Sequence, residues 1–178
     1  ADPWICLPHS ADEDYCTQLG RLVAQLLPAE RKVYVEYSNE VWNPGFAQSR
    51  AIRQAAGERP WYQLYRQRAC QALAAFCQGF GDSQRVVRVL GAQADNVWLT
   101  EQLLQDLPPD AVDALAIAPY FGAELGDPAA GAEALSVAQI LEQCRADVQV
   151  VLARVKQHAQ LAAGQGLPLL AYEAGQHL

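Results

Sequence analysis

Short apolar runs recur along the chain at intervals that predict β-strands separated by helices. Each run is too short for a typical helix, and the valines and tyrosines in several of them favour extended backbone. The run at 114–121 is apolar at nearly every position, as in strands buried on both faces of a parallel sheet. The predicted strands lie near residues 3–7, 33–38, 86–91, 114–120 and 168–173.

Apolar residues at helical spacing occupy most of the sequence between these strands. The first helix has Ser10 or Asp12 as its expected N-cap and ends before Pro28. Residues 42–60, by contrast, show no clean helical period. Further helices are predicted at 61–80, 96–107 and 135–163.

The order of these elements predicts an α/β fold with a parallel sheet of about five βα units. Right-handed crossovers favour strands that neighbour one another in sequence order. Five strands do not close an eight-stranded barrel, whose usual size is about 250 residues. The sheet is therefore expected to be a partial (β/α)8 TIM barrel, and an open doubly wound sheet is the alternative. We expect a single domain over residues 1–178.

Composition narrows the classes of partner. The net charge of −7 and the scattered arginines argue against nucleic acid, which needs clustered basic residues. No apolar run approaches the roughly 20 residues that span a bilayer, so we expect no membrane partner.

The chain has no methionine and no signal peptide before Ala1, and we expect a processed product or an excised segment. The two edge strands of an open sheet are templates for pairing, and we expect a homo-oligomer through exposed sheet edges or pairing with a missing segment.

The sequence favours no metal ion or cofactor. Its five cysteines are an odd number without a CxxC pair, and buried free thiols are the expectation. Neither glycine-rich phosphate motif, GxGxxG or GxxxxGK[ST], occurs.

Two glutamates follow predicted strands. Glu40 comes just after the strand at 33–38, and Glu173 ends the last apolar run. Parallel strands place such ends on one face of the sheet, and a pair of carboxyls roughly 5–6 Å apart is the equipment of retaining glycoside cleavage. A lone glutamate at a strand end is more often solvated or ion-paired. Glu36, in mid-strand, is expected to meet an arginine or to point to a helix.

Three segments carry a family resemblance: Ser38-Asn39-Glu40, Ala118-Pro119-Tyr120 and Tyr172-Glu173-Ala174-Gly175. They resemble the fourth, sixth and seventh strand ends of clan A glycoside hydrolases, the retaining (β/α)8 enzymes that include cellulases and mannanases. Pro8-His9 is similar to the end of the third strand of that family. The chain would then run from the third strand to the seventh.

The resemblance implies a role for each residue. Glu40 would be the general acid/base and Glu173 the nucleophile of a hydrolase that acts on β-linked polysaccharide or oligosaccharide. Asn39 would bind the sugar 2-hydroxyl, Tyr120 would donate a hydrogen bond to Glu173, and His9 would line the sugar site. The resemblance also implies secretion.

Position alone adds two candidates for substrate binding. Trp42, two residues after Glu40, is the expected stacking platform for a sugar ring, and His177 lies four residues after Glu173. His158, in a polar helical stretch, is expected at the surface.

The chain departs from the family in two respects. Ala118 stands where the family commonly has histidine, and the first, second and eighth strands find no counterpart. A non-catalytic carbohydrate-binding domain and a self-assembling partial barrel are therefore the alternatives to the hydrolase.

Overall fold

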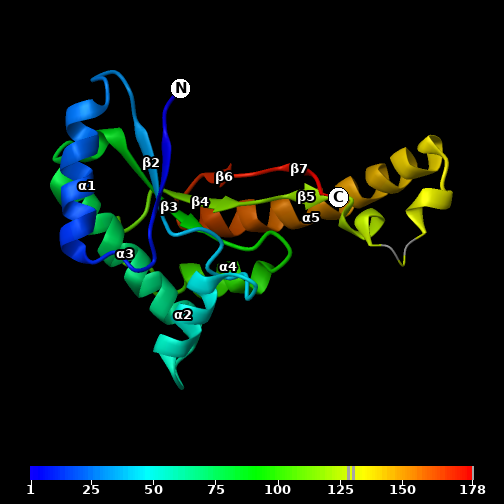
Figure 1. The fold of residues 1–178 in the computed structure, drawn as a ribbon, viewed down its shortest axis with the longest axis horizontal. Coiled ribbons are helices and arrows are strands. Elements are labelled where there is room, and N and C mark those ends of the chain that lie inside the picture. Colours follow the sequence, from blue (N-terminus) through cyan, green and yellow to red (C-terminus); the bar gives the residue numbers. More distant parts are fainter. Residues whose placement is uncertain (128, 130, 178) are drawn as a thin grey trace.

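The computed structural model describes residues 1–127, 129 and 131–177, and their fold is α/β (Figure 1). All pairs in its main sheet are parallel, and the strands neighbour one another in sequence order, as predicted. The main sheet consists of β1 (Trp4–Leu7), β2 (Val33–Tyr37), β3 (Val86–Gly91), β4 (Ala114–Ile117) and β6 (Leu169–Ala171), with β1 and β6 at its edges.

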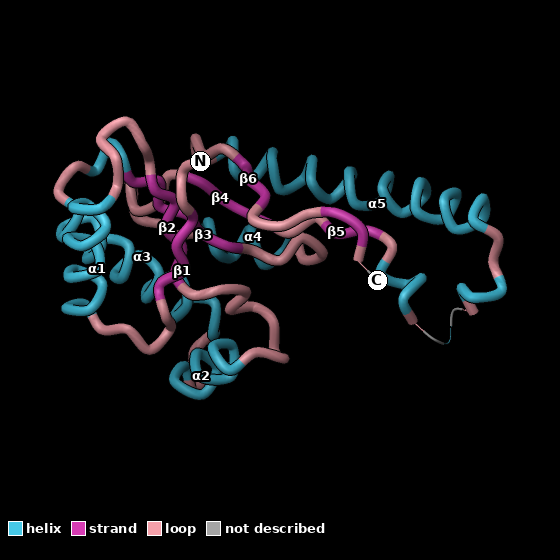
Figure 2. The backbone as a smooth tube through the Cα atoms, turned by 45° about the horizontal axis from the view of Figure 1, so that its top comes forward, coloured by secondary structure: helices cyan, strands magenta, loops and turns pink. Residues whose placement is uncertain are grey.

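Helices connect these strands: α1 (Glu13–Leu26), α2 (Ala47–Ala56), α3 (Trp61–Phe80), α4 (Val97–Leu104) and α5 (Val137–Gly164). Of the two expected caps, Asp12 begins α1, and its side chain accepts a hydrogen bond from the Tyr15 backbone N–H at 2.8 Å. The first half of α5 extends beyond the sheet (Figure 2). Among the described residues, no helix has the length and apolar character to cross a bilayer.

Helix α2 lies in the stretch for which no helix was predicted. It begins after Phe46, which provides no side-chain cap, and its buried face includes Ser49 beside Ile52 and Ala56. A polar and a small residue on the buried face weaken the apolar period that sequence analysis depends on.

The apolar run at 114–121 forms two strands, where one was predicted. β4 ends at Ile117, and β5 (Tyr120–Phe121) pairs in parallel with β7 (Gly175–Gln176) in a second, two-stranded sheet. Pro119 interrupts the run because it has no N–H to donate to a ladder. Short 3-10 helices complete the described elements: η1 (Ser83–Arg85), η2 (Ala123–Gly126) and η4 (Ala132–Ala134).

The main sheet packs one face, here called the outer face, against helices; the opposite face, which carries Glu36, is called the inner face. Side chains alternate along each strand, so Val33, Val35 and Tyr37 of β2 share that face and join one core with residues of α1, α3 and α4. Close packing of α1 on α3 depends on glycine. A Cβ at Gly20 would lie 2.2 Å from the Phe76 carbonyl oxygen, and one at Gly79 would lie 1.9 Å from that of Thr17.

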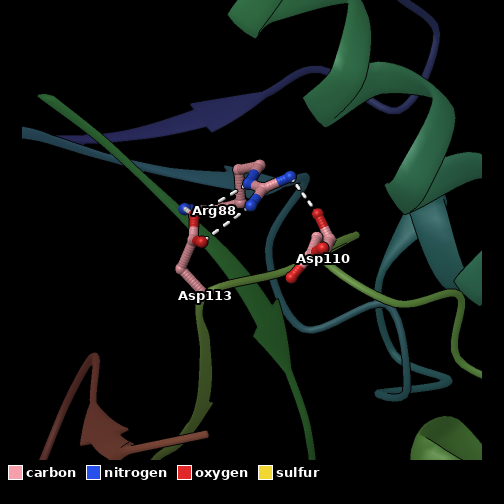
Figure 3. A network of polar contacts seen from close by, with 3 residues as sticks. All are labelled: Arg88, Asp110 and Asp113. Carbon is pink, nitrogen blue, oxygen red and sulfur yellow. Dashed lines mark hydrogen bonds and ion pairs between the residues drawn. The ribbon is translucent and has the colours of Figure 1, made fainter. Parts of the chain in front are cut away.

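An ion pair fixes β3 against the start of β4 (Figure 3). Arg88 Nε donates to Asp113 Oδ2 at 2.8 Å and Nη2 donates to Oδ1 at 2.7 Å, while the guanidinium also donates to the Asp110 carbonyl. Partial burial of Asp113 favours the neutral acid, but the hydrogen bonds from Arg88 outweigh it and lower the pKa of this carboxyl. The pair lies at the amino end of β4, away from the strand ends that carry Glu40 and Glu173.

His158 is fully buried, so the prediction that it lies at the surface was wrong. Its Nδ1 is 2.9 Å from Thr100 Oγ1 on α4, and its Nε2 is 2.9 Å from the Ala94 carbonyl oxygen. Because that carbonyl can only accept, Nε2 carries the proton. Burial lowers the pKa of His158. The neutral ring therefore fastens α5 to α4, and its polar sequence neighbours concealed that role.

Candidate active site

The backbone immediately after β2 is strained. Ser38 has φ 62° and Glu40 has φ 45°, a left-handed conformation that side-chain-bearing residues rarely adopt. Ser38 is buried, and its N–H donates to the Leu7 carbonyl at 2.6 Å, which ties this turn to the end of β1. Strain of this kind costs about 1–3 kcal/mol per residue and concentrates at functional sites.

The carboxylate of half-buried Glu40 has a hydrogen-bond donor on each oxygen. Asn43 Nδ2 donates to Oε2 at 3.0 Å from the same loop. Tyr172, which follows the edge strand β6 and directly precedes Glu173, donates from Oη to Oε1 at 3.5 Å. Both donors limit the orientations open to this carboxylate.

Glu173 is exposed, and it accepts the hydrogen bond that the family resemblance implied. Tyr120 Oη donates to Glu173 Oε2 at 2.7 Å, a short, charge-assisted distance. This bond raises the pKa of Tyr120, so the hydroxyl keeps its proton. The pairing of β5 with β7 brings the two segments together, and the ring of His177 packs against that of Tyr120 with 5.1 Å between centroids.

The two glutamates share one end of the sheet. Strands β2 and β6 are separated by β3 and β4, which corresponds to about 14 Å in a flat sheet. The Tyr172–Glu40 contact spans that interval, so the two strand ends converge. The charges of Glu40 and Glu173 both raise the pKa of Tyr120 and that of Tyr172.

Glu36 neither meets an arginine nor points to a helix, and that prediction was wrong. It is 2% exposed on the inner face of the sheet, where Trp4 Nε1 donates to its Oε2 at 3.2 Å. Burial, opposed by the Trp4 bond and assisted by the charges of Glu40 and Glu173, raises the pKa of Glu36 to about 7. Room for this carboxyl comes from Gly91, whose Cβ would lie 2.5 Å from Glu36 Oε1.

Cys6 is the neighbour of Glu36 on β1 and is exposed, contrary to the expectation of a buried thiol. Burial of part of the side chain and the charges of Glu36 and Glu173 raise the pKa of the thiol to about 11. The thiolate is the reactive form, so Cys6 is a poor nucleophile at neutral pH.

The other three predicted substrate-binding residues, Asn39, Trp42 and His9, differ in their surroundings. Asn39 is half-buried between Ser38 and Glu40, and its carbonyl accepts a hydrogen bond from Gln48. Trp42 is half-buried against the core, which leaves less of the ring for sugar stacking than predicted. His9 lines a cavity of about 400 Å³ with residues of α1 and α3, and its carbonyl accepts a hydrogen bond from Tyr37, an outer-face residue. The structure thus places His9 beside α1 and α3.

Sequence reasoning missed Tyr172, Asn43 and the buried state of Glu36. Tyr172 was visible as the neighbour of Glu173, but its contact with Glu40 spans 132 positions of the chain. The alternation of Tyr34, Glu36 and Ser38 along the strand was the available signal that Glu36 shares the face of Trp4 and Cys6.

The described side chains can perform acid/base and nucleophilic chemistry, because two carboxylates with distinct hydrogen-bond donors lie at one end of the sheet. Comparisons of the chain with protein-family models, curated proteins and solved structures found no match.

Proposed function

We propose that this chain is the catalytic segment of a retaining glycoside hydrolase that acts on β-linked polysaccharide or oligosaccharide. One observation carries the proposal: Glu40 and Glu173 lie at the carboxyl end of one parallel sheet, and Tyr172 links Glu40 to the segment that carries Glu173. The strained backbone at Glu40 and the Tyr120–Glu173 bond support the same interpretation.

In the first step, a carboxylate oxygen of Glu173 bonds to the anomeric carbon while the glycosidic C–O bond breaks. Glu40 gives its proton to the departing oxygen. In the second step, Glu40 takes a proton from water, which attacks the anomeric carbon and releases Glu173. The exposed side chain of Glu173 leaves it accessible to a sugar, and the hydroxyl of Tyr120 holds one of its oxygens so that the other can attack.

Substrate contacts follow from the residues around the pair. Asn39 directly precedes Glu40, and in this proposal its side chain binds the 2-hydroxyl of the sugar. His177 packs on Tyr120, the hydrogen-bond donor to Glu173, and in this proposal it also contacts the sugar. Burial raises the pKa of Glu36 to about 7, so this carboxyl is partly protonated at neutral pH and adds less negative charge than a fully ionised carboxylate would.

The direct test is hydrolysis of 2,4-dinitrophenyl β-glycosides of glucose, mannose and cellobiose, with NMR of the first product anomer. We expect hydrolysis with retention of the β configuration. Glu173→Gln should reduce kcat at least about 10³-fold because it removes the nucleophile. Incubation with a 2-fluoro β-glycoside should add the mass of one sugar to Glu173.

Glu101→Gln is the matched control, since Glu101 is an exposed glutamate on α4 outside the site. It should leave the rate unchanged. Inversion of configuration, or full activity in Glu173→Gln, would remove the nucleophile assignment.

A carbohydrate-binding or self-assembling domain is the second candidate, and the exposure of Glu173 and the edge positions of β1 and β6 favour it. A domain of this kind would bind cello-oligosaccharide or manno-oligosaccharide by calorimetry, or form dimers by light scattering, without releasing sugar. Turnover of any glycoside that depends on Glu173 would exclude it.

A further inference from the structure

Tyr172 connects the two halves of the candidate site. It directly precedes Glu173, and its hydroxyl donates to Glu40 Oε1 at 3.5 Å. The other oxygen of Glu40 accepts from Asn43 Nδ2 at 3.0 Å. The carboxylate of Glu40 is therefore held between a donor from its own loop and a donor from the segment that follows β6.

The hydroxyl of Tyr172 stays protonated and so remains a hydrogen-bond donor. Burial and then the negative charges of Glu40 and Glu36 raise the pKa of Tyr172 well above its usual range. The nearby indole of Trp42 opposes that rise only in part. The phenol keeps its proton at every pH at which glycosides are ordinarily assayed.

We propose that Tyr172 is a positioning residue for Glu40: its hydroxyl orients the acid/base carboxyl and stabilises the carboxylate after the proton has gone to the leaving oxygen. This inference rests on the function proposed above. A separation of 3.5 Å is long for an O–H···O bond, but such bonds in ligand-free sites often shorten when substrate binds.

Leaving-group dependence tests this role. A dinitrophenolate departs without help from an acid, whereas a phenolate needs protonation. For Tyr172→Phe we expect kcat/KM to fall about tenfold with phenyl β-cellobioside and less than about twofold with 2,4-dinitrophenyl β-cellobioside. Glu40→Gln should show the same selectivity with a larger loss, about 10²–10⁴-fold on the phenyl substrate.

Two tyrosine variants provide the controls. Tyr120→Phe removes the donor to Glu173, so both substrates should lose rate together. Tyr34→Phe, on the same sheet face but stacked on Trp4 with 5.4 Å between ring centroids, should change neither. An equal loss on both substrates in Tyr172→Phe, or no loss at all, would overturn the positioning role.

A second readout does not depend on turnover. In a double-mutant cycle of urea unfolding with Tyr172→Phe and Glu40→Ala, each of which removes one partner of the hydrogen bond, a real contact makes the combined loss of stability smaller than the sum of the single losses. If the wild-type chain hydrolyses no glycoside, the proposed function fails while the cycle still decides the contact. Strictly additive losses would overturn it.

Discussion

The two faces of the main sheet differ in what covers them and in what they carry. On the outer face, apolar side chains such as Val35, Leu90 and Leu115 are completely buried in the core shared with the helices. On the inner face, Cys6 is exposed and Trp4, Tyr34 and Tyr172 are half-buried, around the buried carboxyl of Glu36. The outer face thus supplies most of the apolar core, whereas the inner face carries Glu36 and Tyr172 beside the candidate site.

The largest expected difference between the faces is the cost of removing a leucine. Leu115→Ala on the outer face should lower the free energy of unfolding by about 2–5 kcal/mol, because it leaves a cavity in a close-packed core. Leu170→Ala, on the neighbouring strand but on the half-buried inner face, should cost about 1 kcal/mol. Urea denaturation measures both. Equal costs would show that the inner face is as closely packed as the outer.

The buried carboxyl of Glu36 should make stability depend on pH. Its pKa rises from 4.5 to about 7, so the folded state holds a proton that the unfolded state releases. The contribution is complete below pH 4.5 and is lost as the pH rises through about 7, by roughly 3 kcal/mol in total. Glu36→Gln should remove this slope from urea-derived stabilities. A slope that persists in the variant would assign it to another group.

Packing between Gly91 and Glu36 should make Gly91→Ala costly even though alanine is small. The new Cβ would lie 2.5 Å from Glu36 Oε1, and we expect a loss of about 1–3 kcal/mol in the free energy of unfolding. In the Glu36→Ala background the same substitution should cost much less, because the obstructing carboxyl is gone. The same cost in both backgrounds would place the strain elsewhere.

On the helix side of the molecule, His158 should produce the smallest effect, of opposite sign to that of Glu36. Burial lowers the pKa of His158 below 6.5, so its contribution is complete above pH 6.5 and is lost as the pH falls through its folded-state pKa. His158→Gln should remove that loss at acid pH, measured in the Glu36→Gln background so that only one slope remains. Increased stability on acidification in that background would contradict the assignment.

Local signals in the sequence determined the strands, most of the helices and their order. Alternation and helical spacing depend on burial of one face, so they revealed α3 and all five strands of the main sheet. The position of both glutamates at one end of the sheet could be predicted because parallel strands end on one face, whereas the Tyr120–Glu173 bond was expected from the family resemblance. Where a buried face was mixed in character, as in α2, the same signals failed.

Tertiary structure decided the rest, because it depends on which distant segments meet. Glu36 and His158 are polar residues among unremarkable neighbours. Tertiary packing buries them and gives them Trp4 and Thr100 as hydrogen-bond partners. The Tyr172–Glu40 contact requires the ends of β2 and β6 to converge over two intervening strands. A carboxyl or a phenol has the same local sequence whether water or a second carboxylate faces it, and its chemistry is set by that distant neighbour.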